Sequence, residues 1–154
     1  MNLEELSVGQ VMTRDVATLS CDEKLQVADD LMRLGRIRHL PVVDSEGTLL
    51  GIVTQRDLFH SGLLRALGYG WRARHDALEL LVVSEAMKAD VATIEPSASL
   101  IQAAKIMLER KIGCLVVVEN RRIVGILTES DFVRLAVQHS APPRDADNES
   151  LIRS

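Results

Sequence analysis

The 154-residue sequence predicts a mixed α/β (α+β) protein in which one β-α-β-β-α unit occurs twice. The main observation is an internal repeat: Met12 and the short apolar run after it recur at Met87, an offset of 75 residues. Later landmarks keep this offset, as Met32 does with Met107. Because each repeat of this kind is one supersecondary unit, we expect two similar units that pack together.

Each unit is expected to start with a short strand followed by a helix. In the first unit Leu25, Ala28 and Leu31 have the three-residue spacing that is typical of an amphipathic helix. Ser20 or Asp22 can cap the start of this helix by accepting a hydrogen bond from its first turn. The expected strands are 16–19 and 92–95, and the expected helices are 22–34 and 99–109.

A β-hairpin and a second helix complete each unit. The runs His39–Val43 and Cys114–Val118 are almost wholly apolar, and strands of this kind are usually covered on both faces. Polar residues follow each run, at 44–47 and at 119–121, and they predict the hairpin turns. One residue is missing from the second turn, which explains why the repeat offset falls from 75 to 74 beyond it.

The repeat also divides the chain into segments. We expect a first repeat at 7–62 and a second repeat at 83–139. Between them, 63–82 contains several glycines and a mixed charged and apolar stretch, which suits a linker with a short helix. The last residues, 140–154, are almost without apolar side chains, and we expect them to form a disordered tail.

Composition excludes several classes of function. The formal net charge of −4 gives the chain no general attraction to nucleic acid or to anionic lipid. The apolar runs are far shorter than the roughly 20 residues that cross a bilayer, and the N-terminus lacks the layout of a secretion signal. We therefore expect a cytoplasmic protein with no membrane partner. The two cysteines, without CxxC spacing or a nearby His, indicate neither a disulfide nor a metal site.

One polar motif occurs in both units. It reads Gly-apolar-apolar-Thr-x-x-Asp, at Gly51–Asp57 and at Gly125–Asp131. In one interpretation the motif is a capping box at a helix start. In the other, the helix start binds a phosphate and the aspartate accepts hydrogen bonds from ribose hydroxyls, and the sequence leaves both open. Arg56 in one copy and Ser130 in the other make the two sites unequal.

These features together resemble a known family. The two repeats, the run Arg36–Asp44 and the paired motifs look like a stand-alone tandem pair of cystathionine-beta-synthase (CBS) domains, or Bateman module, over residues 7–139. The resemblance implies pseudo-twofold packing of sheet against sheet, with two clefts for AMP, ADP, ATP, S-adenosyl-methionine or related ligands. It also implies a homodimer that regulates an unidentified partner protein and needs no obligatory cofactor.

The resemblance also assigns binding residues by position. Each cleft takes the polar residues of one motif together with apolar and backbone groups of the other repeat. His39 and Cys114 begin equivalent strands, where family members often place phosphate-facing groups, although a lone His at a strand start is more often only partly buried. One cleft takes Thr54, Arg56, Asp57, Val91, Ile112 and Gly113, and the other takes Thr128, Ser130, Asp131, Val16, Ile37 and Arg38.

Because of departures from the family pattern, we favour ligand binding in the cleft that contains Thr128, Ser130 and Asp131. The second repeat has Val116 where the first has Pro41, and Arg56 replaces the hydroxyl that commonly precedes the aspartate. The sequence shows no catalytic motif, so we expect a binding module and not an enzyme. The alternative is a ligand-free structural or protein-interaction domain in which the Thr and Asp of each motif only cap a helix.

Overall fold

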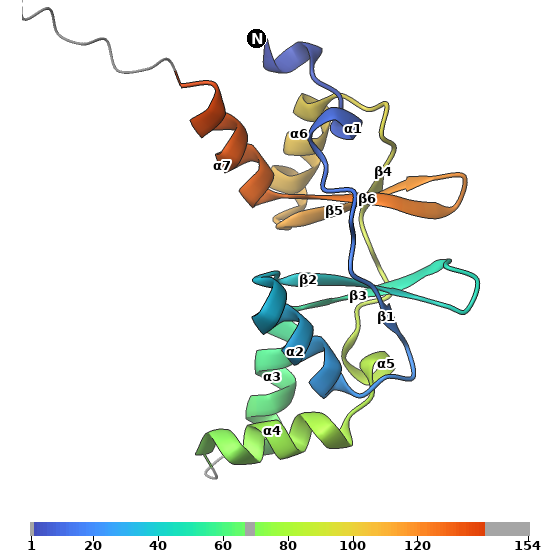
Figure 1. Ribbon diagram of the computed structural model, residues 1–154, viewed down its shortest axis with the longest axis vertical. Coiled ribbons are helices and arrows are strands. Elements are labelled where there is room, and N and C mark those ends of the chain that lie inside the picture. Colours follow the sequence, from blue (N-terminus) through green and yellow to red (C-terminus); the bar gives the residue numbers. More distant parts are fainter. Residues whose placement is uncertain (1, 67–69, 141–154) are drawn as a thin grey trace, which may run out of the picture.

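The first unit is a three-stranded sheet with helices on its outer side. The structure, a computed structural model, describes residues 2–66 and 70–140 (Figure 1). Strand β1 runs parallel to β2, and β2 runs antiparallel to β3, in the order β1-β2-β3. The elements are β1 (Leu19–Ser20), α2 (Leu25–Gly35), β2 (His39–Val43), β3 (Leu49–Thr54), α3 (Gln55–Ala66) and α4 (Gly70–Leu80).

The second unit repeats this plan. Its sheet has the order β4-β5-β6, with the same parallel and antiparallel pairs. Both hairpins shift register at equivalent points, between Val42 and Val43 in one and between Val117 and Val118 in the other. The elements are β4 (Thr93–Ile94), α6 (Leu100–Arg110), β5 (Cys114–Glu119), β6 (Arg122–Thr128) and α7 (Glu129–Gln138).

The two sheets face each other, and the helices lie on the far side of each (Figure 1). Between the sheets, Ile52 of β3 packs in a small core with Val116 of β5 and Ile126 of β6. Each unit also has a larger core beneath its helices, in which Leu40 and Leu115 are fully buried at equivalent positions. The apolar strands are therefore covered on both faces, and the predicted fold class is confirmed.

The segment that precedes each unit in the sequence packs on the other unit. Helix α1 joins the second core, where the Val8 N–H donates to the Ala98 carbonyl at 2.9 Å. Helix α5 joins the first core, where the Val83 N–H donates to the Glu23 carbonyl at 2.8 Å. The two units are thus tied together by an exchange of segments. These segments contain η1 (Leu3–Glu5), α1 (Val8–Val11) and α5 (Val83–Ala86).

The glycine of each motif makes room for an exchanged segment. After α5, the backbones of Lys88 and Ile52 form two hydrogen bonds of 2.9 Å. A Cβ on the neighbouring Gly51 would lie 2.8 Å from the Lys88 oxygen and 2.8 Å from Met87 Sδ. Gly125 has the same role against the segment that follows α1. The motif glycines are therefore needed for packing, because a side chain would push the exchanged segment away.

The range 63–82 contributes to the first core as well as joining the repeats. It contains the end of α3 and all of α4, which packs against α3 and α2. Leu78 is fully buried and Leu81 is 8% exposed, both in the first core. The Leu81 carbonyl also accepts a hydrogen bond of 2.8 Å from the Leu25 N–H. None of the described helices is long and apolar enough to cross a membrane.

The observed limits differ from the predicted ones by a few residues. Strand β1 has only two residues, because only these pair with β2. The prediction that Ser20 or Asp22 caps α2 is wrong: the helix begins at Leu25 without a side-chain cap, and the Ser20 N–H donates instead to the Glu23 carboxylate at 2.9 Å. The expected tail, 140–154, lies outside the described residues beyond its first position.

Candidate functional site

A cavity of about 470 Å³ opens between the two units, where β2 and β5 begin and β3 ends. Its volume is within the range of small-molecule sites. Its lining contains most residues of the first expected cleft, and also Arg38, which we expected in the other cleft. The predicted residues that line it are Arg38, His39, Thr54, Arg56, Val91, Ile112, Gly113 and Cys114.

Part of the cavity lining is apolar. Ile52 comes from the first sheet, and Val91, Ala92 and Ile112 come from the second repeat. Cys114 is 8% exposed, and burial raises the pKa of its thiol to about 12. The thiol therefore stays protonated at neutral pH and packs as a small apolar group. Such a surface suits the face of a base or another flat apolar group.

His39 adds a polar ring that is uncharged at neutral pH. Burial, and next the positive charge of Arg38, lower its pKa, and the opposing effects of Glu129 and Asp57 are smaller. The ring reaches toward Gly113, where a Cβ would lie 3.3 Å from His39 Nε2. The missing side chain at Gly113 therefore leaves the ring room inside the cavity, where its nitrogens can hydrogen-bond to a ligand.

The cavity has a surplus of positive charge. Five basic and two acidic side chains line it, in a chain whose formal net charge is −4. Arg110 is partly balanced, because its guanidinium lies 3.4 Å from the Asp90 carboxylate. Within the part of the chain that the structure describes, Arg38, Arg56 and Lys111 form no ion pair. Unpaired cations gathered in one cavity favour an anionic ligand.

Thr54 and Asp57 together cap the start of α3. The Thr54 N–H and hydroxyl both donate to Asp57 Oδ2, at 2.8 and 2.9 Å. The other carboxylate oxygen, Asp57 Oδ1, lies 3.5 Å from Lys88 Nζ. Thr54 and Lys88 line the cavity, whereas Asp57 is not among its lining residues. The first motif therefore forms a capping box at the start of α3.

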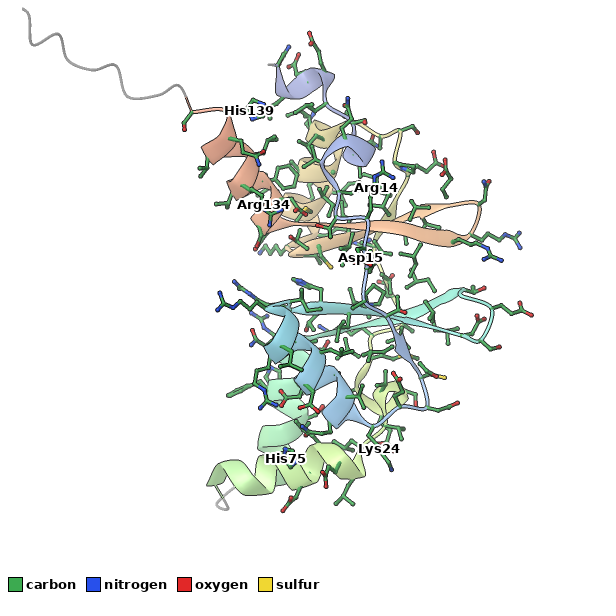
Figure 2. The ribbon with its side chains drawn as sticks, viewed as in Figure 1. Arg14, Asp15, Lys24, His75, Arg134 and His139 are labelled. Atoms are coloured by element: carbon green, nitrogen blue, oxygen red, sulfur yellow. The ribbon has the colours of Figure 1, made fainter. Side chains whose placement is uncertain are left out.

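The second motif also caps a helix, and its residues are not part of the cavity lining. The Thr128 N–H donates to Asp131 Oδ2 at 2.8 Å, and Arg134 of α7 (Figure 2) donates to Asp131 Oδ1 at 3.1 Å. Asp131 is only 3% exposed. Its carboxylate is therefore fully engaged within its own helix. The predicted residues outside the cavity lining are Val16, Ile37, Asp57, Thr128, Ser130 and Asp131.

Several charged residues of the cavity were missed by the sequence reasoning. Arg110 and Lys111 end α6 and directly precede the predicted Ile112. Lys88 occupies the position that Thr13 has in the other repeat, since each pairs with an equivalent strand of the opposite sheet. A position-by-position comparison of the repeats could have found Lys88 and Arg110, because Thr13 and Gly35 stand at those positions in the first repeat. It could not have found Lys111, because its equivalent, Arg36, is also charged.

Comparison with known proteins identifies the family. A model of the CBS domain family matches residues 8–63 and 83–138. The chain therefore belongs to the CBS domain family, and it contains a pair of these domains, which is a regulatory module.

Two relatives show how the pair occurs. The chain is 35% identical over 136 residues to a CBS domain-containing protein of Dictyostelium discoideum, and the match covers 88% of this chain and 94% of that protein. It is 33% identical over 143 residues to inosine-5'-monophosphate dehydrogenase of Mycobacterium tuberculosis, where the match covers 92% of this chain and 24% of the enzyme. The chain thus spans about a quarter of this longer relative.

Solved structures share the fold over nearly their whole length. A putative acetoin utilization protein, AcuB, from Vibrio cholerae is 38% identical with a TM-score of 0.74, covering 89% of this chain and 98% of that one. CBSX2 in complex with AMP is 28% identical with a TM-score of 0.70, covering 86% and 96%. The CBS domain pair of protein MJ0100, in complex with 5'-methylthioadenosine and S-adenosyl-L-methionine, is 26% identical with a TM-score of 0.71, covering 88% and 98%.

Proposed function

We propose that this chain is a regulatory module that binds a phosphorylated adenosine, such as AMP, ADP or ATP, in the cavity between its repeats. The observation that carries the proposal is the set of three cations, Arg38, Arg56 and Lys111, that form no ion pair among the described residues. Each can donate charge-assisted hydrogen bonds to phosphate oxygens. A chain that is acidic as a whole but basic inside one cavity selects an anion there.

The apolar lining and the solved relatives support an adenosine ligand. Val91 and Ile112 offer a surface for the base. CBSX2 was solved with AMP, and the MJ0100 pair with 5'-methylthioadenosine and S-adenosyl-L-methionine. Methylthioadenosine has no phosphate, and S-adenosyl-methionine carries a cationic sulfonium, so neither matches the unpaired cations of this cavity. Charge therefore favours the nucleotides over both sulfur compounds.

Ligand binding can regulate a partner because both repeats line the cavity. Arg38 and Arg56 come from the first repeat and Lys111 comes from the second. A phosphate between these cations screens their mutual repulsion and so favours a closer arrangement of the repeats. A ligand shifts such an equilibrium only through its different affinity for the two arrangements. The regulated partner would bind one arrangement of the repeats more tightly than the other.

Exposed apolar side chains on the outer helices support a homodimer. Phe59 on α3 is 56% exposed and Val133 on α7 is 65% exposed, at equivalent positions of the two repeats. Leu34, Leu108 and Val137 are between 70% and 81% exposed. Because the two repeats present similar apolar helix faces, a second copy related by a twofold axis can cover both.

A thermal-shift screen tests the ligand. A ligand at 100 times its dissociation constant adds about 2.7 kcal/mol of stability, so AMP, ADP and ATP should raise the Tm more than S-adenosyl-methionine or methylthioadenosine. Arg38→Ala should weaken AMP binding by about 10-fold, whereas Arg122→Ala, on the β5–β6 hairpin, should not. If no adenosine ligand raises the Tm, the alternative of a ligand-free interaction domain is correct. The two capping boxes favour that alternative, since they already account for the Thr and Asp of both motifs.

Sedimentation equilibrium tests the homodimer. The wild-type chain should sediment as a dimer, and Val133→Glu should sediment as a monomer because it places a charge in the apolar face. Leu80→Glu is the matched control: Leu80 is 76% exposed but lies at the end of α4, which has no counterpart among the described helices of the second repeat. A monomeric wild-type chain would rule out this assembly.

A further inference from the structure

We propose that Lys88 controls whether Asp57 binds the ribose of an adenosine ligand. Without a phosphate on the ligand, the Lys88 ammonium group stays paired with the Asp57 carboxylate. A phosphate on the ligand draws the ammonium group away, and Asp57 then accepts hydrogen bonds from the ribose hydroxyls. This inference rests on the proposed function. It concerns a residue that the CBS motif does not include, and it depends on three features of the structure.

The first feature is that Asp57 is already occupied. Its Oδ2 accepts hydrogen bonds from both the N–H and the hydroxyl of Thr54, and its Oδ1 lies 3.5 Å from Lys88 Nζ. The Asp57 side chain is only 10% exposed, whereas that of Lys88 is 61% exposed and lines the cavity. The ammonium group therefore lies beside Oδ1, where it competes with a ribose hydroxyl for this oxygen.

The second feature is that this movement is confined to the side chain. The Lys88 N–H donates to the Ile52 carbonyl, and the Ile52 N–H donates to the Lys88 carbonyl, both at 2.9 Å. The backbone of Lys88 is thus fixed on β3 while its flexible side chain extends into the cavity. An ion pair with so exposed a partner is weak and yields to a competing anion. A phosphate beside Arg38 and Arg56 is such an anion.

The third feature is that the other repeat lacks this arrangement. Thr13 occupies the position of Lys88, pairing with Ile126 as Lys88 pairs with Ile52. The carboxylate of Asp131 is held by Arg134 of its own helix, at 3.1 Å. The lysine is therefore a property of the first motif alone, and Arg134 provides a matched ion pair outside the cavity lining.

Calorimetric titration of AMP and of adenosine into the full chain tests the proposal. As a single substitution, Asp57→Asn should weaken AMP binding by about 10-fold and leave the affinity for adenosine within about twofold of wild type. In the Lys88→Met protein, where Asp57 is no longer held, adenosine should bind up to about fivefold more tightly than to wild type, and Asp57→Asn should reverse that gain. Arg134→Met, the matched control, should change neither titration.

The outcomes separate this inference from the proposed function. If AMP binds, but Asp57→Asn weakens AMP and adenosine equally in the wild-type background, Asp57 is always available and the role of Lys88 is refuted. If AMP binds and Lys88→Met leaves adenosine binding unchanged, the role of Lys88 is refuted as well. If none of AMP, ADP and ATP binds, the proposed function fails and this inference fails with it. Unfolding midpoints of each variant confirm that the loss of a capping contact at Asp57 has not unfolded the protein.

Discussion

Gly51→Ala should displace the exchanged segment that follows α5, which carries Lys88 of the cavity lining. A Cβ at Gly51 would lie 2.8 Å from Met87 Sδ and 2.8 Å from the Lys88 carbonyl oxygen. The end of Met87 can move, but the Lys88 oxygen is part of a backbone that is held to Ile52 by two hydrogen bonds of 2.9 Å. The exchanged segment must therefore move off β3, and those two bonds lengthen or break.

The expected loss of stability follows from this geometry. Overpacking a well-packed site costs about 1–3 kcal/mol, and each backbone hydrogen bond that is lost adds about 0.5–1.5 kcal/mol. We expect urea denaturation of Gly51→Ala to give a free energy of unfolding that is lower by about 2–4 kcal/mol. Gly35→Ala is the control, because its Cβ would meet no atom closer than 3.5 Å at the end of α2, and alanine is the better helix former. A Gly51→Ala protein as stable as wild type would refute the packing of the exchanged segment.

Two buried residues and the half-buried His39 give further tests. Among the described residues, Gln26 Oε1 is buried without a hydrogen-bond partner, and the second repeat has Ile101 at the equivalent position. Gln26→Ile should therefore raise the free energy of unfolding in urea by about 1 kcal/mol, and a decrease would contradict this expectation. Burial, and next the charge of Arg38, lower the pKa of His39, so the unfolded chain binds a proton more readily than the folded one. The free energy of unfolding should therefore fall as the pH drops below 6.5, the ordinary pKa of histidine. His39→Gln should reduce this fall, and a variant with the same pH profile as wild type would contradict the role of His39. Burial raises the pKa of Cys114 to about 12, so iodoacetamide at pH 8 should modify Cys114 in urea but not in the native protein, as followed by mass spectrometry.

The fold could be predicted because its determinants are local and occur twice. The apolar run at His39–Val43 coincides with β2, and the run at Cys114–Val118 differs from β5 by one residue. The exchange of segments could not be predicted in this way. The apolar character of Val8 and Val83 indicates that both are buried, but it does not say against which repeat. The need for Gly51 likewise becomes clear only when Lys88 is seen to cross it.

The candidate site could be predicted only where the motif and the family resemblance supply it. They place Thr54 and Arg56 at the cavity, but they do not show whether Asp57 faces a ligand or caps its helix. The structure shows the capping contact and adds Lys88 as a partner that lies far from Asp57 in the sequence. The weighting toward the other cleft rested on Ser130, which does not line the described cavity. Side-chain pairing across the repeats depends on tertiary packing, which a single sequence does not specify.

A crystal structure of the chain soaked with AMP is the most direct test of the central claim, that the cations between the repeats select a phosphorylated adenosine. The phosphate should lie within hydrogen-bond distance of Arg38 or Arg56, with the base against Val91 and Ile112 in the cavity of about 470 Å³. An empty cavity at saturating AMP, or AMP bound beside the Thr128 motif instead, would contradict it.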